Sequence, residues 1–151
     1  MKEKTKIAVA ISGGVDSTLA ASLLKEQGYE VTAVHLQLVP AHCETSTAAV
    51  KKIARQLKIP LEILDLKTAF EEEVVAYFVN QYQAGVSPNP CTLCNPRIKF
   101  GHLYRWARNK GFAYLATGHY ARVQNGQLLT AIDQAKDQTF FLHRLTQEKL
   151  N

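Results

Sequence analysis

The chain has 151 residues, of which 46% are apolar and 21% charged, a balance that excludes an intrinsically disordered protein. No apolar run approaches the roughly 18 residues needed to cross a membrane, and the run 7–11 is too short for a signal-peptide core, so we expect a cytoplasmic protein that does not bind membranes. Three cysteines, two of them spaced as Cys91-x-x-Cys94, do not make a secreted disulfide framework and instead indicate thiol or metal chemistry.

Hydrophobic periodicity and turn residues predict alternating strands and helices along the chain. We expect strands at 6–11, 30–38, 61–66 and 114–117. The first expected helix is opened by Asp16 or Ser17 and ended by Gly28, with Leu19, Ala20, Leu23 and Leu24 on one face. The second is opened by Ser46 or Thr47, and the third runs from Thr68 to near Gly85. The fourth is opened by Asn95-Pro96 and ends near Asn109. Asn125-Gly126 predicts a small β-hairpin near the C-terminus. This order predicts one α/β domain, doubly wound, with a mostly parallel sheet and helices on both faces.

The segment 12–17, Ser-Gly-Gly-Val-Asp-Ser, stands between the first strand and the first helix. Its glycines let backbone N–H groups converge on an anion, and the helix N-terminus adds its dipole. The Gly-Lys-Ser/Thr ending of the kinase and GTPase P-loop is missing, so this is a different phosphate loop. Asp16 beside phosphate would be repulsive without a cation, which implies Mg²⁺.

The positive charge is unevenly distributed. The net charge is +5, yet the 59 residues of 74–132 contain no Asp or Glu and six bases: Arg97, Lys99, Arg105, Arg108, Lys110 and Arg122. A solvated basic face is one reading, and a polyanionic partner such as RNA is the other.

Residues 12–17 resemble the signature of the PP-loop ATP pyrophosphatases, which cleave ATP to AMP and pyrophosphate and share an adenine nucleotide alpha hydrolase-like fold. Three further segments resemble one branch of that superfamily, the tRNA-specific 2-thiouridylases: 87–100 (SPNPCTLCNPRIKF), 116–122 (ATGHYAR) and 133–142 (DQAKDQTFFL). Cys43, before the second helix, also fits this branch, and the resemblance covers about 6–148.

The resemblance implies ATP-dependent 2-thiolation of the wobble uridine of tRNA. ATP would adenylate the C2 oxygen of the base, and a sulfur carried by a cysteine, delivered by a persulfide donor protein, would displace AMP. Carried over to this sequence, the residues that would bind ATP are Ala10, Ile11, Ser12, Gly13, Gly14, Val15, Asp16, Ser17, Leu36 and Gly118. Those that would contact tRNA are Asn89, Pro90, Cys91, His119, Lys136, Asp137 and Gln138, and the acid-free stretch adds Arg97 and Lys99.

Cys94 occupies the position of the first catalytic cysteine of the 2-thiouridylases. It precedes the expected helix cap Asn95, so we expect the helix dipole and Arg97 to favour its thiolate and make it more reactive than Cys91. Cys91 is a candidate second thiol, and the Cys91/Cys94 pair is a candidate for part of an iron–sulfur or zinc site, although two thiolates alone do not make a metal site.

Members of that family are longer, with a second catalytic cysteine and two β-rich domains downstream. We therefore expect an incomplete chain that does not make 2-thiouridine unaided. Two other functions stay open: nucleotide and tRNA binding without turnover, and another AMP-forming PP-loop ligase acting on a metabolite.

Overall fold

A computed structural model of the chain describes residues 4–150. The domain boundaries expected from the sequence, 1–151, therefore include residues 1–3 and 151, which lie outside the described part. The chain divides into two compact units: Met1–Lys67 with Tyr104–Gly118, and Thr68–Leu103 with His119–Asn151. Each unit is described by itself below.

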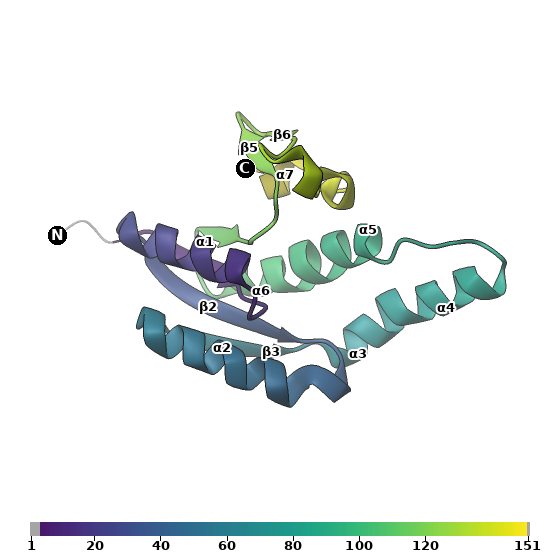
Figure 1. Ribbon diagram of the computed structural model, residues 1–151, viewed down its shortest axis with the longest axis horizontal. Coiled ribbons are helices and arrows are strands. Elements are labelled where there is room, and N and C mark those ends of the chain that lie inside the picture. Colours follow the sequence, from purple (N-terminus) through teal and green to yellow (C-terminus); the bar gives the residue numbers. More distant parts are fainter. Residues whose placement is uncertain (1–3, 151) are drawn as a thin grey trace. The chain divides into compact units, whose positions relative to one another are not determined.

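The first unit is built on a four-stranded parallel sheet in the order β3-β2-β1-β4. Its strands are β1 (Lys6–Ala10), β2 (Glu30–Gln37), β3 (Leu61–Asp65) and β4 (Tyr114–Ala116), and its helices are α1 (Val15–Glu26), α2 (Cys43–Leu57) and α6 (Tyr104–Asn109). Every strand pair is parallel, with Val9 opposite Ala33 of β2 and Ala116 of β4. The predicted doubly wound parallel sheet is confirmed (Figure 1).

One face of this sheet packs against α1 and α2. Side chains of β1 and β2 form a buried cluster with one side chain from each helix: Ile7, Val9, Ile11, Val31, Ala33, Ala21 of α1 and Val50 of α2. The alternating strand residues Ala8 and Val34 point to the other face and are also fully buried, so the sheet is covered on both sides.

The buried face of α1 differs from the expected one. Leu19 and Leu23 are 55% and 47% exposed, whereas Ser17 and Ala21 are buried and Leu24 packs against the core. The helical period was correct, but the phase was wrong, because small residues allow α1 to approach the sheet closely. The expected cap was wrong too: α1 begins at Val15 after Gly14, with no side-chain cap.

The second unit is mostly helical and contains two π-helical segments. Its elements are α3 (Lys67–Phe70), η2 (Glu71–Val75), α4 (Ala76–Gln83), α5 (Cys91–Cys94), η3 (Asn95–Leu103), β5 (Arg122–Gln124), β6 (Gln127–Leu129), the short turns η4 (Gln134–Lys136) and η5 (Thr139–Leu142), and α7 (Gln147–Leu150). The two π-helical segments are η2 and η3. The hairpin β5–β6 is confirmed: Asn125 and Gly126 have φ of 51° and 71°, as a type I′ turn requires.

Three other helix starts differ from the sequence prediction. Ser46 and Thr47 lie inside α2, which begins at Cys43, and Thr68 lies inside α3, where the Asp65 carboxylate accepts from the Lys67 N–H. Asn95 does not open a helix either, since the chain is already helical from Cys91. Three of these predicted caps make other hydrogen bonds: Ser46 with His35, Thr47 with Gln37, and Asn95 with the carbonyl oxygens of Cys91 and Phe141.

Candidate functional site

Residues 12–17 form the expected loop between β1 and α1. Gly13 has a φ of +96°, the left-handed region that favours glycine, whereas Gly14 has an ordinary φ of −81°. The two serine side chains brace the loop: Ser17 Oγ lies 3.3 Å from the Ser12 N–H, and Ser12 Oγ lies 3.3 Å from the Gly14 N–H. The loop is therefore ordered by its own hydroxyl groups around the N-terminus of α1.

Gly118 lies directly against this loop. A Cβ at position 118 would stand 2.6 Å from the Ser17 nitrogen and 2.8 Å from the Asp16 carbonyl carbon, so only glycine fits. Gly118 follows β4, and the loop follows β1, the adjacent strand. Leu36 lies near the end of β2, on the other side of β1, and is half-buried. The carboxyl ends of β1, β2 and β4 thus bring together the residues predicted from the sequence to bind nucleotide, at the edge where open α/β sheets bind ligands.

His35 is a residue of this site that the sequence analysis missed. It is 5% exposed, and its Nδ1 lies 3.0 Å from the carbonyl oxygen of Ile11, immediately before the loop. Its Nε2 lies 3.1 Å from Ser46 Oγ on α2, and Ser46 Oγ in turn lies 2.7 Å from the His42 carbonyl oxygen. A signal was present: a histidine inside an otherwise apolar strand must find polar partners when it is buried.

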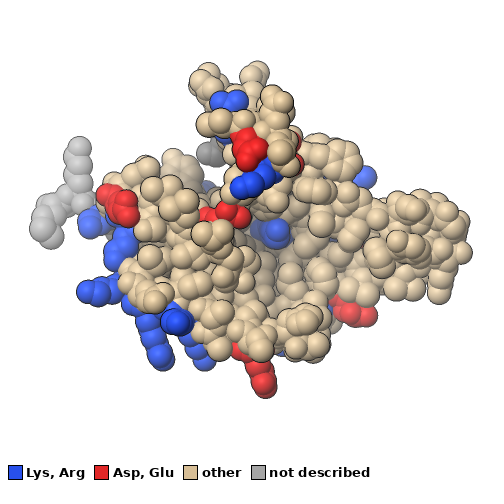
Figure 2. Space-filling view, in the orientation of Figure 1, with Lys and Arg blue, Asp and Glu red and all other residues tan. Residues whose placement is uncertain are grey.

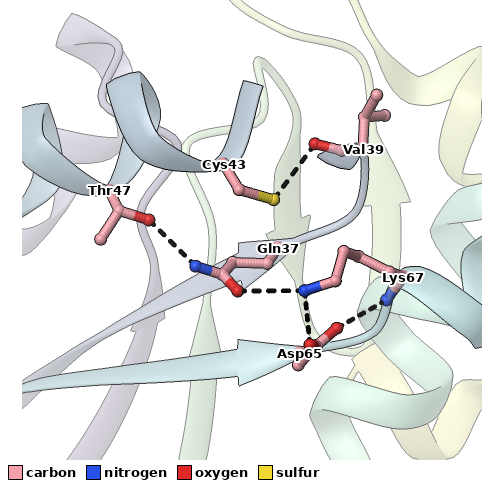
Figure 3. Close-up of polar contacts among 6 residues, drawn as sticks. All are labelled: Gln37, Val39, Cys43, Thr47, Asp65 and Lys67. Atoms are coloured by element: carbon pink, nitrogen blue, oxygen red, sulfur yellow. Dashed lines mark hydrogen bonds and ion pairs between the residues drawn. The ribbon is translucent and has the colours of Figure 1, made fainter. Parts of the chain in front are cut away.

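A polar network continues this edge of the sheet where β2 and β3 end (Figure 3). The Gln37 side chain donates to Thr47 Oγ1 at 3.2 Å and accepts from Lys67 Nζ at 3.4 Å. Lys67 also pairs with the Asp65 carboxylate, and this hydrogen bond lowers the pKa of Asp65. Cys43, the first residue of α2, donates its thiol hydrogen to the Val39 carbonyl oxygen at 3.1 Å. The Gln37 carboxamide is therefore held in one orientation at this edge of the sheet.

The cysteines of the second unit share the single helical turn of α5. The Asn89 side chain accepts from the Cys91 N–H at 3.1 Å and so starts the turn, and Cys91 is exposed. Residues three apart in a helix lie on the same face, so both thiols face the same side. Cys94 is half-buried, and burial raises its pKa, although Lys99 acts to lower it. The expectation of a favoured Cys94 thiolate was wrong, because burial raises the pKa of this thiol and because Cys94 lies at the end of α5 rather than before a helix.

His119 and Lys99 meet beside Phe100. Lys99 Nζ lies 3.4 Å from His119 Nε2, and the rings of Phe100 and His119 have centroids 6.1 Å apart. Burial, together with the Lys99 charge, lowers the pKa of His119 to about 4. At neutral pH the imidazole is therefore uncharged and can accept a hydrogen bond from the Lys99 ammonium group.

Some of the other residues expected to contact tRNA have exposed side chains, and others have side chains that are hydrogen-bonded within their own loop. Arg97 and Lys136 are exposed, and Pro90 is half-buried. Asp137 accepts from the Ala131 and Thr139 N–H groups, and the Gln138 side chain accepts from the Tyr120 N–H at 3.0 Å. Asp137 and Gln138 thus hold their own loop together, and Arg97 presents charge to solvent. Lys136 Nζ lies 3.9 Å from the Asp133 carboxylate and 5.2 Å from the centre of the Tyr120 ring.

The first unit also has a basic surface that the charge count did not reveal. Figure 2 shows blue side chains gathered at the lower left, over the C-terminal end of α2. The exposed bases of that region are Lys51, Lys52, Arg55 and Lys58. In the sequence these charges are offset partly by Glu71, Glu72 and Glu73, which belong to the second unit.

Residues 4–150 contain no group of three or more His, Cys, Asp or Glu side chains that could hold a metal ion. Within the same residues, no helix is both long and apolar enough to cross a membrane.

The family model described as the tRNA methyl transferase HUP domain matches residues 5–151. Among curated proteins, the tRNA-specific 2-thiouridylase MnmA of Desulfitobacterium hafniense (strain Y51) is 46% identical over 99% of this chain and 45% of its own length. The protein of the same name from Fervidobacterium nodosum is 40% identical over 97% of this chain and 46% of its own length. The chain thus spans about half the length of the curated relatives it matches.

Solved structures share the fold at low sequence identity. A 4-thiouridine synthetase, solved as an RNA complex with bound ATP, matches with a TM-score of 0.56 and 19% identity over 87% of this chain and 33% of its own. A predicted subunit of a tRNA methyltransferase from Methanocaldococcus jannaschii matches with a TM-score of 0.51 and 20% identity over 76% of this chain and 52% of its own. At these identities the similarity establishes the fold.

Proposed function

The chain belongs to the tRNA methyl transferase HUP domain family, and on that premise we propose that it acts in ATP-dependent 2-thiolation of the wobble uridine of tRNA. One observation carries the proposal. The loop 12–17, closed by Gly118, lies at the carboxyl edge of a parallel sheet, in a chain 46% identical over 99% of its length to a tRNA-specific 2-thiouridylase. The solved 4-thiouridine synthetase with the same fold binds ATP and RNA, which supports the two proposed ligands.

In this proposal the first unit binds ATP. Backbone N–H groups of 12–17 and the N-terminus of α1 would hold the phosphates, and Ala10, Leu36 and Gly118 would lie beside the nucleoside. Mg²⁺ typically takes one or two carboxylates together with phosphate oxygens, and the carboxylate of Asp16 in the first turn of α1 fits that need. When bound, the metal ion would neutralise phosphate charge.

The second unit would carry the sulfur chemistry and hold the RNA. Adenylation turns the C2 oxygen of uridine into a good leaving group, and a persulfide sulfur on Cys94, supplied by a donor protein in the cytoplasm, would displace AMP and leave the base joined to Cys94 through an S–S bond. A second thiol, for which Cys91 is the candidate in this chain, would cleave that bond, releasing 2-thiouridine and forming a disulfide with Cys94 that a thiol reductant reopens. Asn89, Pro90 and Cys91 would lie against the base, with His119 and 136–138 on the tRNA. A cluster does not fit the donors described here, because Cys91 and Cys94 lack a third ligand, so no step is assigned to one.

Mass spectrometry of tRNA nucleosides tests the proposal directly. We expect these 151 residues, given ATP, Mg²⁺, tRNA and a persulfide donor, to form AMP in a tRNA-dependent manner but no 2-thiouridine, and expect any 2-thiouridine that does form to require Cys94. Binding of ATP and tRNA without AMP formation would make it a binding module, and a methylated base would contradict thiolation.

The ATP site has its own test. Gly14→Val should abolish ATP binding in calorimetry while the protein stays folded. The φ of −81° is open to any residue, and a Cβ there meets only Ser12 Oγ at 3.5 Å, so the added methyl groups should obstruct the phosphates rather than the fold. An unchanged dissociation constant in the folded variant would contradict the assignment of this loop.

A further inference from the structure

A buried histidine joins the phosphate loop to the neighbouring helix. His35 belongs to β2, Ile11 ends the approach to the loop, and Ser46 lies in α2, so one imidazole ring bridges three elements. The ring is 5% exposed, and both of its nitrogens have a polar neighbour within 3.1 Å. Apolar packing alone would not need this residue, because the surrounding strand positions are valine, alanine and leucine.

The direction of the hydrogen bond to Ile11 follows from chemistry. A carbonyl oxygen can only accept, so His35 Nδ1 carries a hydrogen and donates it to the Ile11 carbonyl oxygen. Nε2 faces the Ser46 hydroxyl group, which also lies within reach of the His42 carbonyl oxygen. The hydrogen bond from Nδ1 to Ile11 therefore has only one possible direction. The Ser46 hydroxyl group, by contrast, can donate either to Nε2 or to the His42 carbonyl oxygen.

The hydrogen bond from His35 to the Ile11 carbonyl oxygen sets the direction of the Ser12 N–H, the first N–H group of the loop. The carbonyl of Ile11 and the N–H of Ser12 belong to one planar trans peptide, so they point in opposite directions. Holding the Ile11 carbonyl toward His35 turns the Ser12 N–H away from the ring, where it lies 3.3 Å from Ser17 Oγ at the start of α1. Rotation of this peptide plane would remove one donor from the loop.

We propose that His35 is a positioning residue for nucleotide binding: it orients the peptide between Ile11 and Ser12 so that the phosphate loop is formed before ATP arrives. This inference rests on the proposed ATP site. Preorganised donors bind an anion more tightly because the protein does not pay the ordering entropy on binding.

Three substitutions of His35 test the contact of Nδ1 with Ile11 separately from the contact of Nε2 with Ser46. In His35→Asn the amide nitrogen stands near the place of Nδ1 and can still donate to Ile11, whereas in His35→Gln it reaches toward the place of Nε2 and Ser46. His35→Leu keeps bulk and removes both contacts. Ser46→Ala is the matched control, because it removes the contact with α2 and leaves the hydrogen bond to Ile11 intact.

Calorimetry with ATP and Mg²⁺ gives the main result. We expect the dissociation constant to rise about tenfold in His35→Leu and His35→Gln, and to stay within about threefold of the parent in His35→Asn and Ser46→Ala, since one hydrogen bond is at stake. Urea unfolding of the four variants reports stability separately. If affinity falls in proportion to stability in all four, or is unchanged in His35→Leu, the positioning role is overturned.

Amide hydrogen exchange at Ser12 gives a second result that needs no nucleotide. We expect faster exchange of the Ser12 amide in His35→Leu and His35→Gln than in His35→Asn, and parental exchange in Ser46→Ala. Failure of the parent to bind ATP would contradict the proposed function, and the exchange pattern would still decide the role of His35. Equal exchange in all variants would overturn it.

Discussion

Cys91 and Cys94 are three residues apart but have different surroundings. Cys91 is exposed at the first position of α5. Cys94 is half-buried with a raised pKa, and Lys99 offsets only part of the effect of burial. The position proposed for catalysis therefore holds the more buried thiol of the two, and its pKa is raised.

This difference predicts an order of alkylation. With Cys43→Ser as background, a variant retaining only Cys91 should react with iodoacetamide faster at pH 7 than one retaining only Cys94. Because the raised pKa leaves less thiolate below it, the Cys94 rate should keep rising at higher pH than that of a free thiol. Lys99→Met should slow Cys94 further, and Arg97→Met is the control. Faster labelling of Cys94 at pH 7 would contradict the raised pKa.

At the scale of elements, η3 is wound as a π-helix where the sequence predicts an α-helix. The backbone approaches itself closely at Gly101, where a Cβ would stand 2.9 Å from the Pro96 carbonyl oxygen. Pro96 lies five residues earlier, and five residues is also the spacing of hydrogen bonds in a π-helix. Leu103 and Ile98 are fully buried on this segment, so the winding sets which side chains enter the core. Such segments often occur at functional sites, and this one follows directly after Cys94.

Gly101→Ala should therefore destabilise the protein by about 1–3 kcal/mol, the usual cost of an overpacked position. Urea unfolding with a constant m-value would measure it. Gly14→Ala is the control, since its Cβ makes only an ordinary contact at 3.5 Å with φ at −81°. An equal effect of the two substitutions would mean that η3 rewinds without strain.

The loop around Asp137 predicts a pH dependence. Its carboxylate accepts from the Thr139 side chain and from the Ala131 and Thr139 N–H groups, and these hydrogen bonds lower the pKa of Asp137. A lowered pKa stabilises the fold above the unfolded value of about 4, and this stability is lost as the pH falls through the folded value.

Asp137→Asn should accordingly lower the urea midpoint at pH 7 and reduce its change between pH 7 and pH 3. Glu148→Gln, at an exposed carboxylate, is the control and should behave as the parent. An unaltered pH profile in Asp137→Asn would show that the carboxylate charge has no part in holding the loop.

At the scale of the whole molecule, two basic surfaces are candidates for the proposed binding of RNA. One includes Arg97 in the acid-free stretch, and the other lies over the end of α2 and includes Arg55 (Figure 2). Neutralising a phosphate releases counterions, so each contact adds about one unit to the slope of log affinity against log salt. Lys99 is half-buried beside His119 and is a weaker candidate for such a contact than Arg97.

Arg97→Glu should weaken tRNA binding, most strongly at low salt, and reduce the salt slope by about one unit, while ATP affinity barely changes. Filter binding across a salt series would measure both quantities. Arg55→Glu is the matched charge reversal and should have little effect. If Arg55→Glu weakens binding and Arg97→Glu does not, the surface over α2 is the one that holds RNA.

The sequence by itself determined the parallel sheet, the loop 12–17, the hairpin at Asn125-Gly126 and the family. These depend on local patterns: buried strand runs, glycines at positive φ and short motifs. The tertiary structure alone decided the buried face of α1, the π-helical winding of η3, the bridge from His35 to Ile11 and the burial of Cys94. Each of these depends on which atoms surround a residue, and those atoms come from segments that are distant in the sequence: His35 is 24 residues from Ile11, and Lys99 is 20 from His119. Periodicity states that a helix has a buried face, but only packing selects which side chains fill it.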